Sequence, residues 1–324
     1  MPHLGSLFIE GGVWWTGMTD DGFFTRVASF ASVVRLSLND VTFPSTTVFA
    51  RFVCALEQLE ELYCVNIKTV KKRTGRELFL PLRHSSKLSH FTLVGSQVHD
   101  IIDFVVASGL SQRLTDLCLH VGSVDYRSFA HLDAVAYRDL FSACWSLRTL
   151  HLQLRDAAVA KTVSPDTGLG TFTCHAISGR LCRPDLHASF CVARYLDLDA
   201  RHLEILHLSV EPHLYGDYHF GWIATFLSQV CSGHAVRELD ITFDIQGETD
   251  EIAHDLLLVR LSDEADLSGI DRVLASTRYA GLENVEVALR VGHVESRLIK
   301  SREALWAERV HVQLRSVESQ GILR

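Results

Sequence analysis

The chain has 324 residues, of which 47% are hydrophobic and 22% are charged, and its formal net charge is −8. This composition is that of an ordinary folded protein, and the acidic balance argues against nucleic acid as the main ligand, because phosphate binding needs a basic face. No apolar run reaches the roughly 18 residues of a membrane-spanning helix, and residues 1–10 lack the basic and apolar parts of a secretory signal, which predicts a cytoplasmic or nuclear protein.

The motif leucine-x-x-leucine-x-leucine recurs along the whole chain in slightly varied form. Its copies are, in chain order, Leu4-Leu7-Ile9, Val33-Leu36-Leu38, Leu88-Phe91-Leu93, Leu114-Leu117-Leu119, Leu147-Leu150-Leu152, Leu203-Leu206-Leu208, Val236-Leu239-Ile241 and Leu282-Val285-Val287. A looser copy surrounds Leu59 and Leu62, and a last one is expected near Val310 and Val312. Each copy is short and alternating, which is typical of a β-strand of about four or five residues.

Segments with helical spacing lie between these motifs. Residues 46–57, 98–107, 125–144 and 222–230 each carry apolar residues three or four positions apart. Such a stripe is the core-facing side of a helix. The sequence therefore predicts strands that alternate with helices.

The central apolar residues of most successive motifs recur at a spacing within or near that of leucine-rich repeats. The step from Leu150 to Leu206 is twice the usual one and could hide one degenerate repeat, and the long step from Leu239 to Val285 indicates an insertion. A single strand and helix cannot bury both faces, whereas stacked units can. We therefore predict an α/β leucine-rich-repeat solenoid that spans 1–324 as a single domain. It would have a curved parallel sheet with helices on the outer face, irregular repeats of about 26–33 residues, and irregular insertions near 155–194 and 248–276.

The eight cysteines are scattered, and none forms a Cys-x-x-Cys pair. Without a secretory signal, this distribution predicts reduced thiols, several of them buried. Cys174, His175, Cys182, His187 and Cys191 are more widely spaced than the ligands of a typical zinc site. The sequence therefore predicts no metal and no cofactor.

Charge is unevenly distributed along the chain. Residues 237–271 contain eleven Asp or Glu and two Arg, whereas residues 68–76 contain five basic residues. Each run predicts a solvated segment. The alternatives are an acidic rim that binds protein and, for Lys71-Lys72-Arg73, a nuclear-targeting segment.

Alternation along each strand predicts which residues face away from the core leucines. The residue after each central leucine, and the one two positions further, should point to the open face of the sheet. The candidate partner-binding residues on that face are Tyr63, Thr92, His120, His151, Gln153, His207, Asp240, Thr242 and Glu286. Four of them, His151, His207, Asp240 and Glu286, are expected to be near neighbours if their strands are consecutive.

Histidine and carboxylate groups are also what a general base or a metal site uses. The sequence has no Gly-x-Ser-x-Gly motif, no phosphate-binding loop and no His-Glu-x-x-His motif. We therefore predict polar contacts with a protein partner and no catalytic residues. An enzyme that uses the histidine and carboxylate face is the alternative.

Three segments resemble the leucine-rich-repeat region of basidiomycete F-box-type proteins. The stretch from Val33 to Phe43, with the following Phe49-Ala50-Arg51-Phe52 and Leu59-Glu60-Glu61-Leu62, looks like one of their repeats. Cys144-Trp145-Ser146-Leu147-Arg148-Thr149-Leu150-His151-Leu152 looks like their unit of leucines after a helix. The ending Ser319-Gln320-Gly321-Ile322-Leu323-Arg324 is similar to their C-terminal Gly-Ile-Leu.

This resemblance implies the substrate-binding part of a Skp1–cullin–F-box ubiquitin ligase receptor. The F-box, a helical segment of about 45 residues, would precede the repeats, and the sequence opens at Pro2-His3-Leu4 inside what looks like a first repeat. Skp1 is therefore an expected partner only if an F-box lies upstream. The alternative is a free leucine-rich-repeat scaffold without a ligase role, and neither a membrane nor nucleic acid is expected as a partner.

Overall fold

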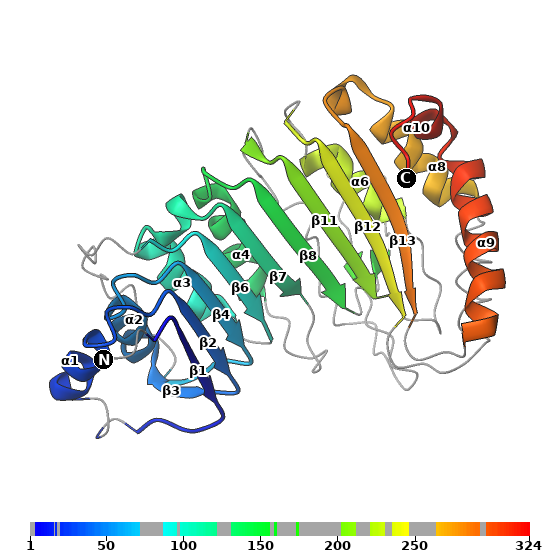
Figure 1. Cartoon of the computed structure of the whole chain (residues 1–324). Coiled ribbons are helices and arrows are strands. Elements are labelled where there is room, and N and C mark those ends of the chain that lie inside the picture. Colours follow the sequence, from blue (N-terminus) through cyan, green and yellow to red (C-terminus); the bar gives the residue numbers. More distant parts are fainter. Residues whose placement is uncertain are drawn as a thin grey trace. The chain divides into compact units, whose positions relative to one another are not determined.

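A computed structural model of the chain describes residues 4–15, 17, 20–71, 87–95, 98–121, 131–155, 159–160, 173–174, 202–211, 221–230, 235–245, 264–291 and 296–324. The chain forms two compact units, Met1–Arg148 and Thr149–Arg324 (Figure 1). Both contain parallel strands and helices, which confirms the predicted α/β class. None of the described helices is long and apolar enough to cross a membrane.

In the part that the structure describes, the first unit contains a row of five parallel strands that are neighbours in chain order. They are β1 (Ser6–Glu10), β2 (Arg35–Asn39), β4 (Glu61–Val65), β6 (His90–Val94) and β7 (Asp116–Val121). Their central apolar residues form one row across the sheet, since each pairs with the next: Leu7, Leu36, Leu62, Phe91 and Leu117. The predicted strand motifs and their alignment are therefore confirmed in this unit.

The turns that follow three of these strands share a positive backbone φ angle. The residue that follows β2, β4 and β6 has a positive φ, at Asp40, Asn66 and Gly95. The N–H of Asp40 donates to the carbonyl of Val65 at 2.9 Å, and the N–H of Asn66 donates to the carbonyl of Val94 at 2.8 Å. Asp, Asn and Gly tolerate a positive φ better than other residues, so the sequence supports the same turn after each of these three strands.

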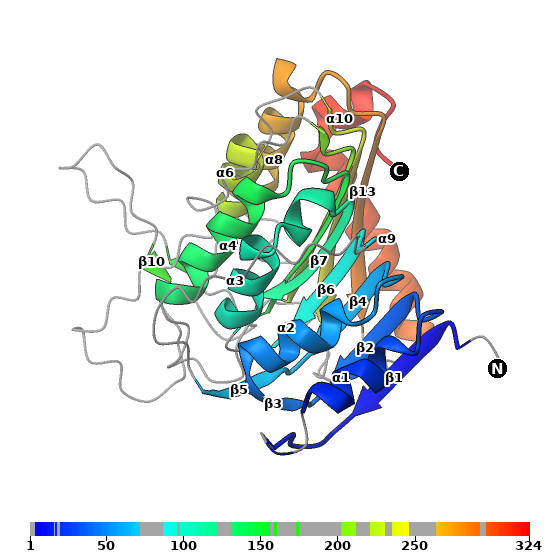
Figure 2. The ribbon, with the colours of Figure 1, turned by 90° about the vertical axis from the view of Figure 1, so that its left-hand side faces the viewer.

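Helices cover the face of this sheet on which the leucines lie (Figure 2). They are α1 (Asp21–Ala28), α2 (Thr46–Cys54), α3 (His99–Ala107), the short 3-10 helix η2 (Leu110–Arg113) and α4 (His131–Ala143). The helices predicted over 46–57, 98–107 and 125–144 correspond to α2, α3 and α4. The hydroxyl of Ser45 accepts a hydrogen bond from the N–H of Val48 at 3.3 Å and so caps the first turn of α2.

A second, small parallel pair joins β3 (Thr42–Ser45) to β5 (Lys68–Lys71). The first part of the basic run 68–76 is therefore a strand, whereas the sequence predicted a solvated connection. Short strands of this kind are hard to predict because only four residues carry the pattern. The rest of that run lies outside the described residues.

Among its described residues, the second unit contains four parallel strands. They are β8 (Thr149–Arg155), β11 (Ile205–Glu211), β12 (Glu238–Ile245) and β13 (Asn284–Val291). Leu150 pairs with Leu206, which shows that β8 and β11 are direct neighbours. A degenerate repeat hidden between them would have placed a strand there, so that hypothesis is wrong for this sheet. Within the insertion predicted near 155–194, the described strands are β9 (Val159–Ala160) and β10 (Thr173–Cys174), which pair antiparallel with each other.

The described helices of the second unit are α6 (Gly221–Val230), α8 (Glu264–Leu274), the 3-10 helix η4 (Thr277–Tyr279), α9 (Ser296–Gln313) and α10 (Arg315–Ser319). The helix predicted over 222–230 corresponds to α6. The insertion predicted near 248–276 includes α8, which buries Leu267, Ile270 and Leu274 at helical spacing. Part of that segment is thus a core helix, and residues 246–263 lie outside the described residues.

The repeat expected at Val310 and Val312 is wrong, because these residues belong to α9. Val310 is buried and Val312 is exposed. The buried residues Trp306, Val310 and Leu314 are four positions apart, which is the period of one helix face. The distance along the sequence from Val285 matched one repeat and suggested a strand, but the surrounding Arg, Glu, Ala and Leu residues favour a helix.

The C-terminal residues pair with the start of β13 on its outer edge. The N–H of Val285 donates to the carbonyl of Ile322 at 2.8 Å, and the N–H of Arg324 donates back to the carbonyl of Val285 at 2.9 Å. The segment is held in place from α8, where the buried carboxylate of Asp271 accepts from the N–H groups of Ser316 and Val317 at 3.1 Å. The start of this strand edge is therefore closed to pairing with another chain.

Candidate functional site

Every candidate residue lies on a sheet strand and faces away from the buried leucines. We call this side of each sheet the polar face of that unit. The first unit carries Tyr63, Thr92 and His120, and the second carries His151, Gln153, His207, Asp240, Thr242 and Glu286. Each unit thus has its own set of candidate residues.

The polar face of the first unit also carries a row that the sequence analysis missed. It consists of the residue before each central leucine, and its members are Arg35, Glu61, His90 and Asp116. The same alternation rule, applied one step backwards along each strand, would have found them. The row alternates between basic and acidic groups across four neighbouring strands, which is the favourable order for cross-strand pairs.

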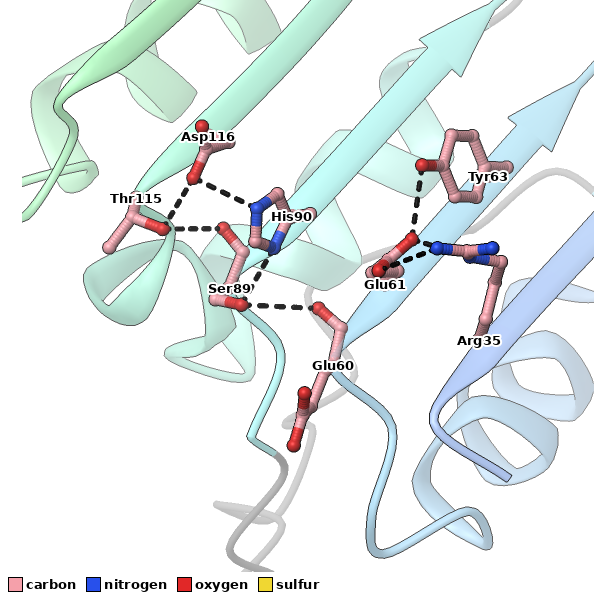
Figure 3. Close-up of polar contacts among 8 residues, drawn as sticks. All are labelled: Arg35, Glu60, Glu61, Tyr63, Ser89, His90, Thr115 and Asp116. Carbon is pink, nitrogen blue, oxygen red and sulfur yellow. Dashed lines mark hydrogen bonds and ion pairs between the residues drawn. The ribbon is translucent and has the colours of Figure 1, made fainter. Parts of the chain in front are cut away.

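Arg35 and Glu61 form a bidentate ion pair at the start of β2 and β4 (Figure 3). Arg35 Nε lies 2.6 Å from Glu61 Oε2, and Arg35 Nη2 lies 2.9 Å from Glu61 Oε1. The hydroxyl of Tyr63 donates to Glu61 Oε2 at 3.1 Å. The hydrogen bonds from Arg35 hold the pKa of Glu61 below its ordinary value, so this carboxylate is ionised at neutral pH. Burial and the neighbouring Glu61 raise the pKa of Tyr63, which keeps the phenol protonated.

His90 and Asp116 form the second pair of this row (Figure 3). His90 Nε2 lies 3.2 Å from Asp116 Oδ2, and the other ring nitrogen, Nδ1, lies 2.8 Å from Ser89 Oγ. Thr115 Oγ1 donates to the same carboxylate at 2.6 Å. The imidazole is therefore held on both sides, and about half of its surface remains exposed for an outside contact.

The other candidate residues of the first unit are His120 and Thr92, and Cys118 lies beside Thr92 on the same face. Burial lowers the pKa of His120, so its ring is neutral at pH 7. Cys118 pairs in register with Thr92, and burial raises the pKa of its thiol. A thiol of this kind is a poor nucleophile, because the thiolate is the reactive form.

The polar face of the second unit brings four candidate residues side by side. Strand register places His151 opposite His207, His207 opposite Asp240, and Asp240 opposite Glu286. The expected proximity of these residues is therefore confirmed. The rings of His151 and His207 are stacked, with 4.2 Å between their centroids and 8° between their planes.

Asp240 is the best-connected group in this row. His207 Nδ1 lies 3.2 Å from Asp240 Oδ2, and Thr242 Oγ1 donates to Oδ1 at 3.0 Å. Burial raises the pKa of Asp240, but the hydrogen bonds from His207 and Thr242 and the charge interactions with His207 and Arg290 together lower it by more, and the net direction is downward. Asp240 is thus ionised at neutral pH. Glu286 is exposed on the neighbouring strand, so the row ends in two adjacent negative groups.

This arrangement is suited to hydrogen bonding and charge pairing with an outside molecule. An Asp–His pair also orients a general base, but in the part of the chain that the structure describes no hydroxyl or thiol is bonded to His207. No group of three or more His, Cys, Asp or Glu among the described residues could hold a metal. The side chains of Cys174, His175, Cys182, His187 and Cys191 lie outside the described part.

No protein-family model matches the chain, and no curated protein matches it in sequence. The resemblance to F-box-type proteins therefore stays a prediction.

Proposed function

We propose that the chain is a non-catalytic protein-recognition module with a leucine-rich-repeat fold, and that it binds a protein partner on the polar faces of its two units. The observation that carries this proposal is the register of the strands. It aligns polar side chains from successive motifs into rows, with neighbouring strands about 4.8 Å apart, on a rigid sheet whose other face is buried. Ordered side chains lose little entropy on binding.

The regular backbone supports the leucine-rich-repeat part of the proposal. Strands at successive motifs start with the same shared hydrogen bond, as when the N–H groups of Glu60 and Glu61 both donate to the carbonyl of Val34. The N–H groups of Ser89 and His90 donate in the same way to the carbonyl of Glu60. Stacked repeats that contact only their neighbours are the defining property of solenoid proteins.

The resemblance extends the proposal to the substrate-binding part of a Skp1–cullin–F-box ubiquitin ligase receptor. In that role the polar faces would select the substrate, and an F-box encoded upstream would bind Skp1. Co-purification of Skp1 with the product of the complete reading frame is the test. If Skp1 does not associate, the chain is a free recognition scaffold.

Site-specific photo-crosslinking tests the recognition surface directly. A photoreactive residue is placed at Tyr63 or Glu286 on the polar faces, and at Arg26 or Arg272 on exposed helix positions as controls. We expect Tyr63 and Glu286 to yield the same crosslinked partner, identified by mass spectrometry, and the helix positions to yield none of it. A partner captured only from the helix positions would contradict the proposal.

Charge reversal then tests the acidic end of the second unit. The double change Asp240→Lys and Glu286→Lys should weaken binding of the crosslinked partner by about tenfold or more, because like charges at an interface are strongly unfavourable. The matched control is Glu283→Lys with Glu308→Lys, which changes the net charge equally at exposed positions outside the row. Equal affinity of the two double variants would place the binding surface elsewhere.

One observation favours a second candidate, an enzyme that uses the histidine and carboxylate face. The Asp240–His207 hydrogen bond is the orienting contact of many general bases. An activity of the purified chain that is lost in His207→Ala and retained in His90→Ala would support an enzyme over a recognition module.

A further inference from the structure

The outer edge of β1 has no strand beside it among the described residues, since β1 pairs only with β2. The outer edge of β13 pairs, as described above, with the C-terminal residues at Val285. An uncovered strand edge is a template on which another strand can add. Within the part of the chain that the structure describes, the two outer strands therefore differ, and β1 offers its outer backbone groups to an occupant.

The backbone groups on this edge can be assigned from the bonds to β2. The carbonyl of Gly5 accepts from the N–H of Arg35 at 3.1 Å, and the N–H of Gly11 donates to the carbonyl of Asn39 at 2.8 Å. In a strand, the N–H and C=O of one residue point to the same side and alternate from residue to residue. The backbone N–H and C=O groups of residues 5, 7, 9 and 11 therefore point toward β2. It follows that Ser6, Phe8 and Glu10 present their N–H and C=O groups outward.

The side chains show that the apolar surface is incomplete at the same place. Leu36 and Leu38 in β2 are fully buried, whereas Leu7 and Ile9, which pair with them, are only half buried. On the polar face, Phe8 is 60% exposed. A further strand beside β1 would cover apolar side chains on both faces of the sheet.

The sequence of β1 is symmetric in polarity about Phe8. Apolar Leu7 and Ile9 flank it, and polar Ser6 and Glu10 lie at the ends. We infer that the occupant of this edge is a second copy of the chain, which pairs antiparallel through β1 with Phe8 of one copy opposite Phe8 of the other. The pair would be isologous, with the same patch used on both copies.

This register satisfies every outward group of the strand. Phe8 exchanges both backbone hydrogen bonds with its counterpart, and Ser6 of each copy does the same with Glu10 of the other. Leu7 of one copy lies opposite Ile9 of the other, so apolar groups meet apolar groups. The hydroxyl of Ser6 faces the carboxylate of Glu10, to which it can donate.

Charge favours the antiparallel arrangement over a parallel one. A parallel pair in register would place the two Glu10 carboxylates side by side, and like charges directly opposite are unfavourable. The antiparallel pair puts them at opposite ends of the interface.

Disulfide trapping tests the register in the full chain. In a hydrogen-bonded antiparallel pair the two Cα atoms at position 8 would be about 5.5 Å apart, within reach of a disulfide. The two Cα atoms at position 6 would be about 14 Å apart, which a disulfide cannot span. Under mild oxidation, Phe8→Cys should form a covalent dimer, and both Ser6→Cys and the unchanged chain should not. Equal crosslinking of Phe8→Cys and Ser6→Cys would overturn the inference.

Oligomeric state tests the association itself, without relying on a cysteine. Light scattering at a protein concentration of about 50 µM should find a dimer for the unchanged chain, because complexes with interfaces of modest size are populated at that concentration. Phe8→Lys and Phe8→Glu should each raise the dissociation constant by about tenfold or more, and an equimolar mixture of the two should dimerise again because opposite charges then meet. Trp145→Lys, at another exposed aromatic residue, is the control and should remain dimeric.

Three outcomes of this second experiment would overturn the inference. They are a monomer for the unchanged chain, a dimer that survives Phe8→Lys, and a mixture of the lysine and glutamate variants that stays monomeric. Phe8 is mostly exposed, so its replacement should leave the melting temperature of the monomer unchanged, which thermal unfolding would check. The inference does not depend on the proposed recognition function.

Discussion

Asp240 and His207 are hydrogen-bonded at 3.2 Å across two neighbouring strands, although 33 residues separate them in the sequence. His207 in turn stacks on His151. Three residues from three copies of the leucine motif thus form one connected group on the polar face of the second unit. The contact exists because the strands are parallel and in register, so equivalent positions in each motif lie side by side.

Replacing Asp240 by Asn should make the second unit less stable at neutral pH. The folded-state pKa of Asp240 is lowered, so its stabilising effect is present above the unfolded pKa of about 3.9 and is lost as the pH falls through the folded value. We expect a loss of about 1 kcal/mol at pH 7, and a difference that disappears at an acid pH below the lowered folded-state pKa of Asp240. Denaturant unfolding at both pH values is the measurement. Glu286→Gln, on the exposed neighbour, is the control and should cost less stability than Asp240→Asn at pH 7.

Removing the guanidinium of Arg35 should raise the pKa of Glu61. The hydrogen bonds from Arg35 are the largest cause of its lowered value, and Arg35→Ala removes them. Arg35→Lys keeps the charge but loses the bidentate geometry, so its effect should be intermediate. Carboxyl chemical shifts followed by NMR through an acid titration would measure this. A Glu61 titration that is unchanged in Arg35→Ala would contradict the ion pair.

Asp271 should be a specific anchor of the C-terminal segment. Its buried carboxylate accepts the N–H groups that begin α10, and Asp271→Ala would leave both without a partner at a cost of about 1–3 kcal/mol. We expect faster hydrogen exchange at Val285, whose N–H depends on the same segment. Arg272→Ala, at the exposed next residue of α8, should leave exchange at Val285 unchanged.

A charge placed in a core row should unfold the unit that contains it. Leu117 and Leu206 are fully buried, so Leu117→Asp in the first unit and Leu206→Asp in the second should each cost several kcal/mol. Thermal unfolding would report a lost or strongly lowered transition. Val70→Asp, at a residue that is 66% exposed, should have little effect. An unchanged melting temperature for either leucine variant would rule out the stacked-strand arrangement.

Much of the candidate site could be predicted because a strand alternates with a period of two. The leucines of each motif locate the core face, and the residues between them must then lie on the other face. Tyr63, His207 and Asp240 were found in this way. The row that contains Arg35 and Glu61 was missed only because the rule was applied in one direction along each strand. The partners of these groups were not predictable, since an ion pair depends on side-chain conformation.

Spacing alone was a weaker guide at two places. The double-length gap between Leu150 and Leu206 looked like two repeats, but β8 and β11 are direct neighbours. The gap between Val285 and Val310 looked like one repeat, but Val310 belongs to a helix. Both errors arise because sequence distance does not determine whether a segment enters the sheet. Pairing with a neighbouring strand decides that.

By itself, the sequence determined the α/β class, the positions of the motif strands and the face on which each strand residue lies, because local hydrophobic periodicity sets all three. Only the tertiary structure decided which strands are neighbours, that His151 stacks on His207, and that the C-terminal residues pair with β13 at Val285 whereas no strand among the described residues lies beside the outer edge of β1. These properties depend on contacts between residues far apart in the chain, and such contacts are absent from any local pattern.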